Sequence, residues 1–270
     1  MFGLTSVNRD GSFEPNHYYN LSWIKKASSS NESVATVSAT ADVLEGTYDV
    51  EVVQLAKGVS LASSGEIDGN KSLKEMLRLG DEDVIEFTLN GKKFVIGNLN
   101  LENGEYDIEE NTAYMDGDLG SIRLRDVVNL INNAKLKDGD KEKSLGVKAS
   151  YDSVNDRFFL QTTGTGKDAK IEISAQGAGA DLIKALKLPG LEEVGNEIEF
   201  SKTGEDAIIN FNGAEGITSS TNRITVNGIT INLLKEENFT ITIGTDVDAI
   251  YEKVEEFINQ YNELVEKTNK

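Results

Sequence analysis

The sequence predicts a mainly β fold with some α-helix (α+β), built from β-rich segments, short helices and one long helix at the end. Three observations predict it. Many short segments alternate apolar and polar residues at period two, which is typical of half-buried strands. Asn-Gly dipeptides at 90–91, 212–213 and 227–228 supply tight turns, because both residues tolerate positive φ. From residue 246 onward the apolar residues recur instead at helical spacing.

The front part of the chain has strand character over residues 28–60. Within it, residues 46–52 alternate large apolar and acidic side chains. A strand points successive side chains to opposite faces, so we expect Tyr48, Val50 and Val52 to face a core.

Hairpins and short helices are expected through the middle of the chain. Alternating runs meet at a turn in residues 85–96, 147–162 and 224–233, which predicts three hairpins. Apolar residues at near-helical spacing predict short helices over residues 73–79, 121–134 and 180–188. Pro189-Gly190 ends the last of these helices.

The last segment predicts a long amphipathic helix. A first apolar stripe recurs at spacings of 3, 4, 3, 4 and 3 residues and consists of Val247, Ile250, Val254, Phe257, Tyr261 and Leu264. A second stripe beside it consists of Tyr251, Ile258 and Val265. Thr245 and Asp248 fit an N-terminal capping pair. We expect these nine apolar residues to form a protein interface: the first stripe against other helical segments of the chain itself, the second against a neighbouring subunit or further helices outside this sequence.

Composition narrows the function classes. The chain has 270 residues, 27 of them basic and 46 acidic, for a net charge of −19. Such a surface repels phosphate backbones and anionic lipids, which argues against nucleic-acid and membrane partners. Without cysteine there are no disulfides or thiolate sites, and a catalytic triad could be built only around the single histidine, His17. We therefore expect a protein that is not an enzyme.

The candidate ligand sites lack the spacing that their chemistry requires. Residues 163–168 resemble a phosphate loop, but Asp168 stands where magnesium binding needs Ser or Thr. Asp116, Asp118 and residues 138–140 lack the ligand spacing of a calcium loop. We expect no cofactor, no metal and no catalytic residue. Paired carboxylates that converge in space remain open.

Several segments, in order, resemble a known family. Residues 46–56 (GTYDVEVVQLA) are similar to a signature near the front of flagellar cap proteins. Residues 127–132 followed by 146–150 (GVKAS) resemble the flagellin hook IN motif. Residues 206–233 resemble the second conserved block of the cap proteins, and 257–264 (FINQYNEL) their stalk helix. The chain therefore resembles a central fragment of the flagellar hook-associated protein 2 family.

The resemblance implies nested β-rich head domains on a helical stalk. It places an inserted outer α+β domain at 81–203, and an inner β domain in two parts at 27–80 and 204–244. The stalk would comprise residues 1–26, where Pro15 interrupts a helix, and the helix at 245–270. We expect the natural chain to extend beyond both ends of this sequence.

The resemblance also implies a function. Family members cap the tip of the bacterial flagellar filament as a homo-oligomeric ring and promote flagellin folding and insertion. The implied partners are further copies of the chain, flagellin and hook-filament junction proteins, and the implied location is the extracellular flagellum tip. Residues 1–4 lack the layout of a cleaved signal peptide, so export is expected by the flagellar secretion system. Alternatives are a hook-filament junction protein, or a tip adhesin whose head binds host surface glycans; an extracellular hydrolase is disfavoured.

Overall fold

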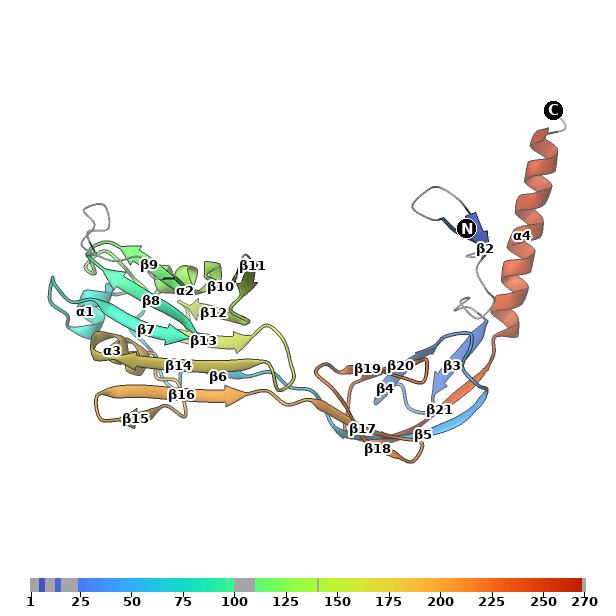
Figure 1. Cartoon of the computed structure of the whole chain (residues 1–270), viewed down its shortest axis with the longest axis horizontal. Helices are drawn as coiled ribbons and strands as arrows, with labels where there is room; N and C mark the ends of the chain where they lie inside the picture. The colour runs from blue at the N-terminus through green and yellow to red at the C-terminus, as the bar shows by residue number, and fades with distance from the viewer. Residues whose placement is uncertain (1–4, 8–12, 16–23, 100–109, 140, 269–270) are drawn as a thin grey trace. The chain divides into compact units, whose positions relative to one another are not determined.

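The computed structural model describes residues 5–7, 13–15, 24–99, 110–139 and 141–268 (Figure 1). The chain divides into two compact units. Unit 1 combines residues 1–56 with 206–270, and unit 2 is the segment 57–205 between them. His17 and Asp140 lie outside the described residues. Of the expected segment 1–26, the short antiparallel strands β1 (Thr5–Val7) and β2 (Phe13–Pro15) are described.

Unit 1 contains two β-sheets that share a core. The five-stranded sheet has the order β18 (Ala214–Ser219), β17 (Ala207–Phe211), β5 (Gly46–Gln54), β21 (Asn238–Thr245) and β3 (Lys25–Ser29). The three-stranded sheet has the order β19 (Arg223–Val226), β20 (Ile229–Leu233) and β4 (Ala35–Ala39). The long helix α4 (Val247–Thr268) follows β21. All the pairings within these two sheets are antiparallel.

The core of unit 1 confirms the inward face expected for residues 46–52. Val50 and Val52 are buried, and Tyr48 is half-buried with its ring stacked on Phe211 at 5.5 Å between centroids. Ile209, Ile231 and Ile241 are among the buried side chains from the neighbouring strands. Because successive residues of β5 point to opposite faces, the acidic residues between these apolar ones face solvent.

Unit 2 is an α+β structure around one larger core. Its six-stranded sheet has the order β15 (Glu192–Val194), β16 (Glu197–Thr203), β14 (Lys170–Gln176), β7 (Ile85–Leu89), β8 (Lys92–Gly97) and β9 (Thr112–Asp116). A three-stranded sheet has the order β12 (Val147–Asp152), β13 (Arg157–Thr162) and β6 (Ser60–Ala62). The helices are α1 (Leu73–Leu77), α2 (Leu124–Asn133) and α3 (Gly177–Ala185). A separate hairpin joins β10 (Lys135–Asp138) to β11 (Lys141–Ser144).

The helices of unit 2 pack their apolar faces into its core. α2 buries four apolar side chains: Leu124, Val127, Val128 and Ile131. α3 approaches β7 so closely that a Cβ at Gly179 would lie 1.7 Å from the backbone oxygen of Glu86. Glycine at that position is therefore required for the helix to reach the strand.

The expected hairpins are confirmed, together with the turn geometry that predicted them. At the three Asn-Gly turns, Asn90, Asn212 and Asn227 have φ between 48° and 49°, and the glycine after each also has positive φ. Each pair is a two-residue loop between antiparallel strands. Positive φ at both positions is the type I′ geometry that matches strand twist.

The boundary expected at residue 80 is corrected by the structure. Residues 57–80 belong to unit 2, because β6 pairs with β13 and the side chains of Leu61, Ile67 and Leu73 are buried in the unit 2 core. The first and last residues of unit 2 are hydrogen-bonded to each other. The Lys57 N–H donates to the Glu205 carbonyl (2.8 Å), and the Glu205 N–H donates to the Lys57 carbonyl (2.9 Å). Unit 2 thus spans 57–205 rather than 81–203.

Candidate functional site

Helix α4 carries all nine residues expected to form an interface. None of its described side chains is buried. Tyr251 is 68% exposed, Phe257 52% and Ile258 51%, while Ile250 is half-buried. Packing of the first stripe against the chain's own stalk is thus not seen among the described residues. An isolated helix of this length is marginal in water, so its apolar face needs a partner.

The two stripes form one continuous face. At 3.6 residues per turn, the nine apolar residues occupy an arc of about 140° around the helix axis. Acidic residues follow on the side of the second stripe, among them Asp248, Glu252 and Glu255, whereas Lys253 lies beside the first stripe. A partner of the second stripe therefore meets an acidic margin.

The ion pairs of α4 join residues three or four positions apart on the helix surface. Lys253 Nζ lies 2.7 Å from Glu256 Oε2, and this hydrogen bond holds the pKa of the Glu256 carboxyl below its ordinary value. Lys267 Nζ lies 3.9 Å from Glu263 Oε2. Exposed pairs of this kind contribute little to stability. The apolar face, not the charged one, is therefore the chemically distinctive surface of α4.

The cap of α4 differs from the expected Thr245–Asp248 pair. The backbone N–H of Ala249 donates to Asp246 Oδ1 (3.0 Å), which makes Asp246 the N-cap. The Thr245 hydroxyl instead donates to the Glu45 carboxylate, which also accepts from Lys25. Thr245 is the last residue of β21, and this bond ties it to the loop before β5.

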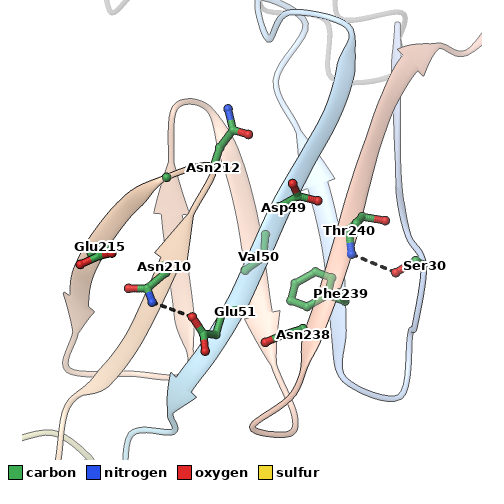
Figure 2. A pocket seen from close by; sticks show the side chains of 11 residues that line it. Ser30, Asp49, Val50, Glu51, Asn210, Asn212, Glu215, Asn238, Phe239 and Thr240 are labelled. Carbon is green, nitrogen blue, oxygen red and sulfur yellow. Dashed lines mark hydrogen bonds between the residues drawn. The ribbon is translucent and has the colours of Figure 1, made fainter.

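A second feature is an open polar groove in unit 1, of about 580 Å³ (Figure 2). It is lined by residues of β5, β17, β18 and β21, the turn between β17 and β18, and Ser30 after β3. Glu51 accepts a hydrogen bond from the Asn210 carboxamide (2.7 Å). The aromatic residue in its lining, Phe239, is only 4% exposed. The groove therefore offers no exposed aromatic platform of the kind that stacks on sugars. Sequence reasoning missed it, because its residues come from strands far apart in the chain.

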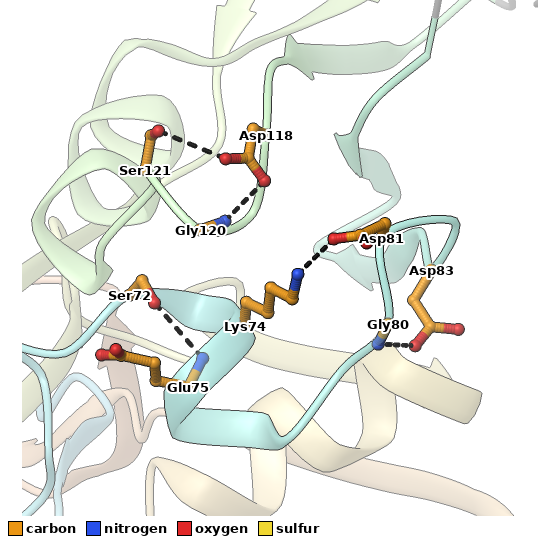
Figure 3. A network of polar contacts seen from close by, with 9 residues as sticks. All are labelled: Ser72, Lys74, Glu75, Gly80, Asp81, Asp83, Asp118, Gly120 and Ser121. Atoms are coloured by element: carbon orange, nitrogen blue, oxygen red, sulfur yellow. Dashed lines mark hydrogen bonds and ion pairs between the residues drawn. The ribbon is translucent and has the colours of Figure 1, made fainter.

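Polar groups in the loops that resemble calcium and phosphate sites make hydrogen bonds that stabilise local turns. Asp118 Oδ1 accepts from the Gly120 N–H (2.9 Å) in the turn before α2, and Ser72 caps α1 by accepting from the Glu75 N–H (3.3 Å) (Figure 3). The Gly166 N–H donates to the Lys57 carbonyl (3.2 Å), so this amide of the phosphate-loop candidate is not free for an anion. In the described ranges, no group of three or more His, Cys, Asp or Glu side chains could hold a metal ion.

Among the residues that the structure describes, no helix combines the length and the apolar character that a bilayer span requires.

The fold defines the class of protein. It matches the crystal structure of the Escherichia coli flagellar cap protein FliD D1-D2-D3 domains, with a TM-score of 0.60 and 18% identity over 92% of this chain and 74% of that one. The structure of the Escherichia coli FliD D2-D3 domains matches with a TM-score of 0.53 and 19% identity, covering 82% of this chain and all of that one. The architecture is therefore that of flagellar cap proteins.

Sequence comparisons agree with the likeness in fold. The profile of the flagellar hook-associated protein 2 N-terminus matches residues 7–58, and that of its C-terminus matches residues 204–270. Flagellar hook-associated protein 2 of Halalkalibacterium halodurans is 28% identical over 89% of this chain and 45% of its own length. The lateral flagellar hook-associated protein 2 of Vibrio parahaemolyticus is 28% identical over 90% of this chain and 50% of its own length.

The chain is therefore similar to flagellar hook-associated protein 2 at both of its ends: residues 7–58 match the N-terminal model of that family and residues 204–270 match the C-terminal model. It spans about half the length of these curated relatives. The two matched segments cover most of unit 1 and extend two residues into unit 2 at each end, and the segment between them is the rest of unit 2.

Proposed function

We propose that this chain is the head and part of the stalk of a protein that caps the tip of the flagellar filament. The single observation that carries the proposal is the pair of family profiles that match both parts of unit 1, on a fold shared with cap proteins. The protein works by binding other proteins rather than by catalysis. Its partners are further copies of itself, flagellin and hook-filament junction proteins, and it acts outside the cell after export through the flagellar secretion system.

Self-association is assigned to the apolar face of α4. The second stripe, Tyr251, Ile258 and Val265, contacts a neighbouring subunit, and the first stripe receives stalk helices. The solvent exposure of these side chains supports the assignment, because they lie on one face of α4 and leave a contiguous apolar surface uncovered. Surfaces of this kind mark interaction sites in soluble proteins. No observation favours the adhesin alternative, since the groove of unit 1 lacks an exposed aromatic side chain.

The test places a charge in the second stripe. Burying Ile258 in an interface contributes roughly 1.5–3 kcal/mol, and Ile258→Asp both removes that gain and puts a carboxylate into an apolar seam. In the full-length protein, Ile258→Asp should weaken ring assembly, measured by analytical ultracentrifugation and electron microscopy, and shorten filaments in cells that express only this variant.

The matched control is Asn259→Asp. It adds the same carboxylate at the next position of α4, on the polar side, and should leave ring assembly unchanged. Circular dichroism should show the β head folded in both variants. If Ile258→Asp assembles like Asn259→Asp at micromolar concentration, the second stripe is not an interface between subunits.

A further inference from the structure

We propose that Asn212 is a site of spontaneous deamidation, and that among the described Asn-Gly turns it reacts first. Asn90-Gly91, Asn212-Gly213 and Asn227-Gly228 share the same dipeptide and the same turn geometry. The dipeptide alone would therefore give them similar reactivity. Their surroundings differ, and these differences set the order.

The reaction needs only the chain and water. The backbone nitrogen of the glycine loses its proton to hydroxide and attacks the side-chain carbonyl carbon of the asparagine. A C–N bond forms and the bond from that carbon to Nδ2 breaks. The departing nitrogen takes a proton from water and leaves as ammonia, which restores the hydroxide. Water then opens the cyclic imide at the side-chain carbonyl to give aspartate, or at the main-chain carbonyl to give isoaspartate. The asparagine side chain must be free to turn toward the glycine nitrogen.

Asn90 is held in place by its whole carboxamide. Its Nδ2 donates to the carbonyls of Leu145 (3.0 Å) and Lys170 (2.8 Å), and its Oδ1 accepts from the Glu172 N–H (2.8 Å). Attack by Gly91 requires all three hydrogen bonds to break. Breaking them leaves polar groups without partners, two of these bonds being partly buried, so Asn90 should react most slowly.

At the turn of Asn227, a hydrogen bond and close packing restrain the following glycine, Gly228. The Gly228 carbonyl accepts from the Thr40 N–H (3.0 Å), and a Cβ at Gly228 would lie 2.6 Å from Thr40 Oγ1 and 2.8 Å from Val43 Cγ2. The peptide that must rotate is therefore packed against residues 40–43. Asn227 itself is exposed, which places its reactivity between the other two.

Asn212 has neither restraint. Its backbone N–H donates to the Asp49 carbonyl (2.8 Å), but within the described part of the chain its exposed carboxamide has no hydrogen-bond partner; Figure 2 shows this side chain at the hairpin turn with no dashed contact. A Cβ at Gly213 would meet nothing within 4 Å. The loop joins β17 to β18, which is the edge strand of its sheet. The Asn212 carboxamide can therefore turn toward the Gly213 nitrogen without breaking a side-chain hydrogen bond or displacing a packed group at Gly213.

The products would alter the groove of unit 1. Asp49, Glu51 and Glu215 already line it, so a carboxylate at position 212 adds to a negative cluster. Aspartate tolerates the turn geometry, whereas isoaspartate lengthens the main chain of a two-residue loop and breaks the β17–β18 register. The isoaspartate form should thus expose β18 to faster amide exchange.

The experiment follows each site by peptide mapping and mass spectrometry in the full chain incubated at mildly alkaline pH. We expect the mass gain of about one dalton to appear at Asn212 at least several-fold faster than at Asn90, with Asn227 between them. In guanidinium chloride the three sites should react at similar rates. Asn103-Gly104 lies outside the described residues and is followed on its own peptide.

The matched variant is Asn212→Gly, which retains a residue that accepts positive φ and removes the reactive carboxamide. It should abolish the gain on that peptide and leave the rates at Asn90 and Asn227 unchanged. The proposal is overturned if Asn90 or Asn227 reacts as fast as Asn212 in the folded chain, if none of the three reacts, or if the same order persists in denaturant.

Discussion

At the residue scale, Asn132 joins α2 to the edge strand β12. Its Nδ2 donates to the Ala149 carbonyl and its Oδ1 accepts from the Ala149 N–H, both at 2.9 Å. β12 has only β13 as a strand partner, so the carboxamide takes the place of a further strand. Both residues belong to the segments that resemble the flagellin hook IN motif, and this contact gives that motif a structural role.

Asn132→Ala should destabilise unit 2. Ala149 is 5% exposed, so its N–H and carbonyl would lose their partner in a buried place. Leaving such groups unpaired costs about 1–3 kcal/mol. Chemical denaturation monitored by circular dichroism should show the loss. Asn133→Ala, at the exposed neighbouring position, is the control, and an equal loss in both variants would contradict the role given to Asn132.

Tyr151 makes stability depend on pH at the alkaline end. Burial raises the pKa of its phenol to about 12, and the hydrogen bond from Oη to Asp156 Oδ1 (2.5 Å) adds to the shift. Gly69 lies against the ring, where a Cβ would come within 2.6 Å of Cζ. The folded state therefore holds this proton more strongly than the unfolded state does.

The stability that Tyr151 contributes is complete below its unfolded pKa of about 10 and is lost as pH rises toward 12. Urea titrations across this range should show the free energy of unfolding falling more steeply in the parent chain than in Tyr151→Phe. Parallel pH profiles for the two proteins would show that the phenol titrates as it does in the unfolded chain.

At the element scale, the start of α4 depends on Asp246. Asp246→Ala should cost about 0.5–2 kcal/mol of helix stability, because the Ala249 N–H loses its acceptor. Hydrogen exchange should accelerate in the first turn of α4. Asp246→Asn keeps a capping oxygen and should leave exchange nearly unchanged, which separates the cap from the charge. Equal acceleration in both variants would assign the effect to charge alone.

A strand or helix could be predicted from the sequence when the residues it pairs with lie close to it along the chain. Hairpins were predictable because strand, Asn-Gly turn and strand lie together in the chain. The heptad spacing likewise predicted α4 and the face that its nine residues share. Strand β6 was not predictable, since its partner β13 lies about a hundred residues further on. The parallel pairing of β8 with β9 also left no local pattern.

The sequence predicted which residues form the candidate interface of α4, but it could not predict what covers that interface. Spacing shows which side chains share a helix face, but what covers that face depends on contacts outside the helix. The N-cap illustrates the same limit at one residue: Thr245 fits the capping pattern, yet Thr245 ends strand β21 and Asp246 caps the helix. The groove of unit 1 left no pattern in the sequence, because Asp49 and Glu215 meet only after folding.

At the scale of the whole molecule, the chain leaves unit 1 after β5, builds unit 2 and returns to unit 1 at β17. Each unit has its own hydrophobic core. The ends of unit 2 are joined by the reciprocal backbone hydrogen bonds of Lys57 and Glu205. An insert whose ends lie together leaves the fold of its host uninterrupted, which is the usual condition for domain insertion.

We therefore predict that residues 57–205 fold alone, and that unit 1 folds when Ala56 is joined to Asp206 by a short Gly/Ser linker. Each should show one cooperative thermal transition. Residues 81–203 should not fold stably, because that cut removes the buried side chains of Val59, Leu61 and Leu73. Each contributes roughly 1.5–3 kcal/mol on burial, and together they approach the total stability of about 5–15 kcal/mol that a domain possesses. A cooperative transition for 81–203 equal to that for 57–205 would contradict the boundary at residue 56 and return residues 57–80 to the inner domain.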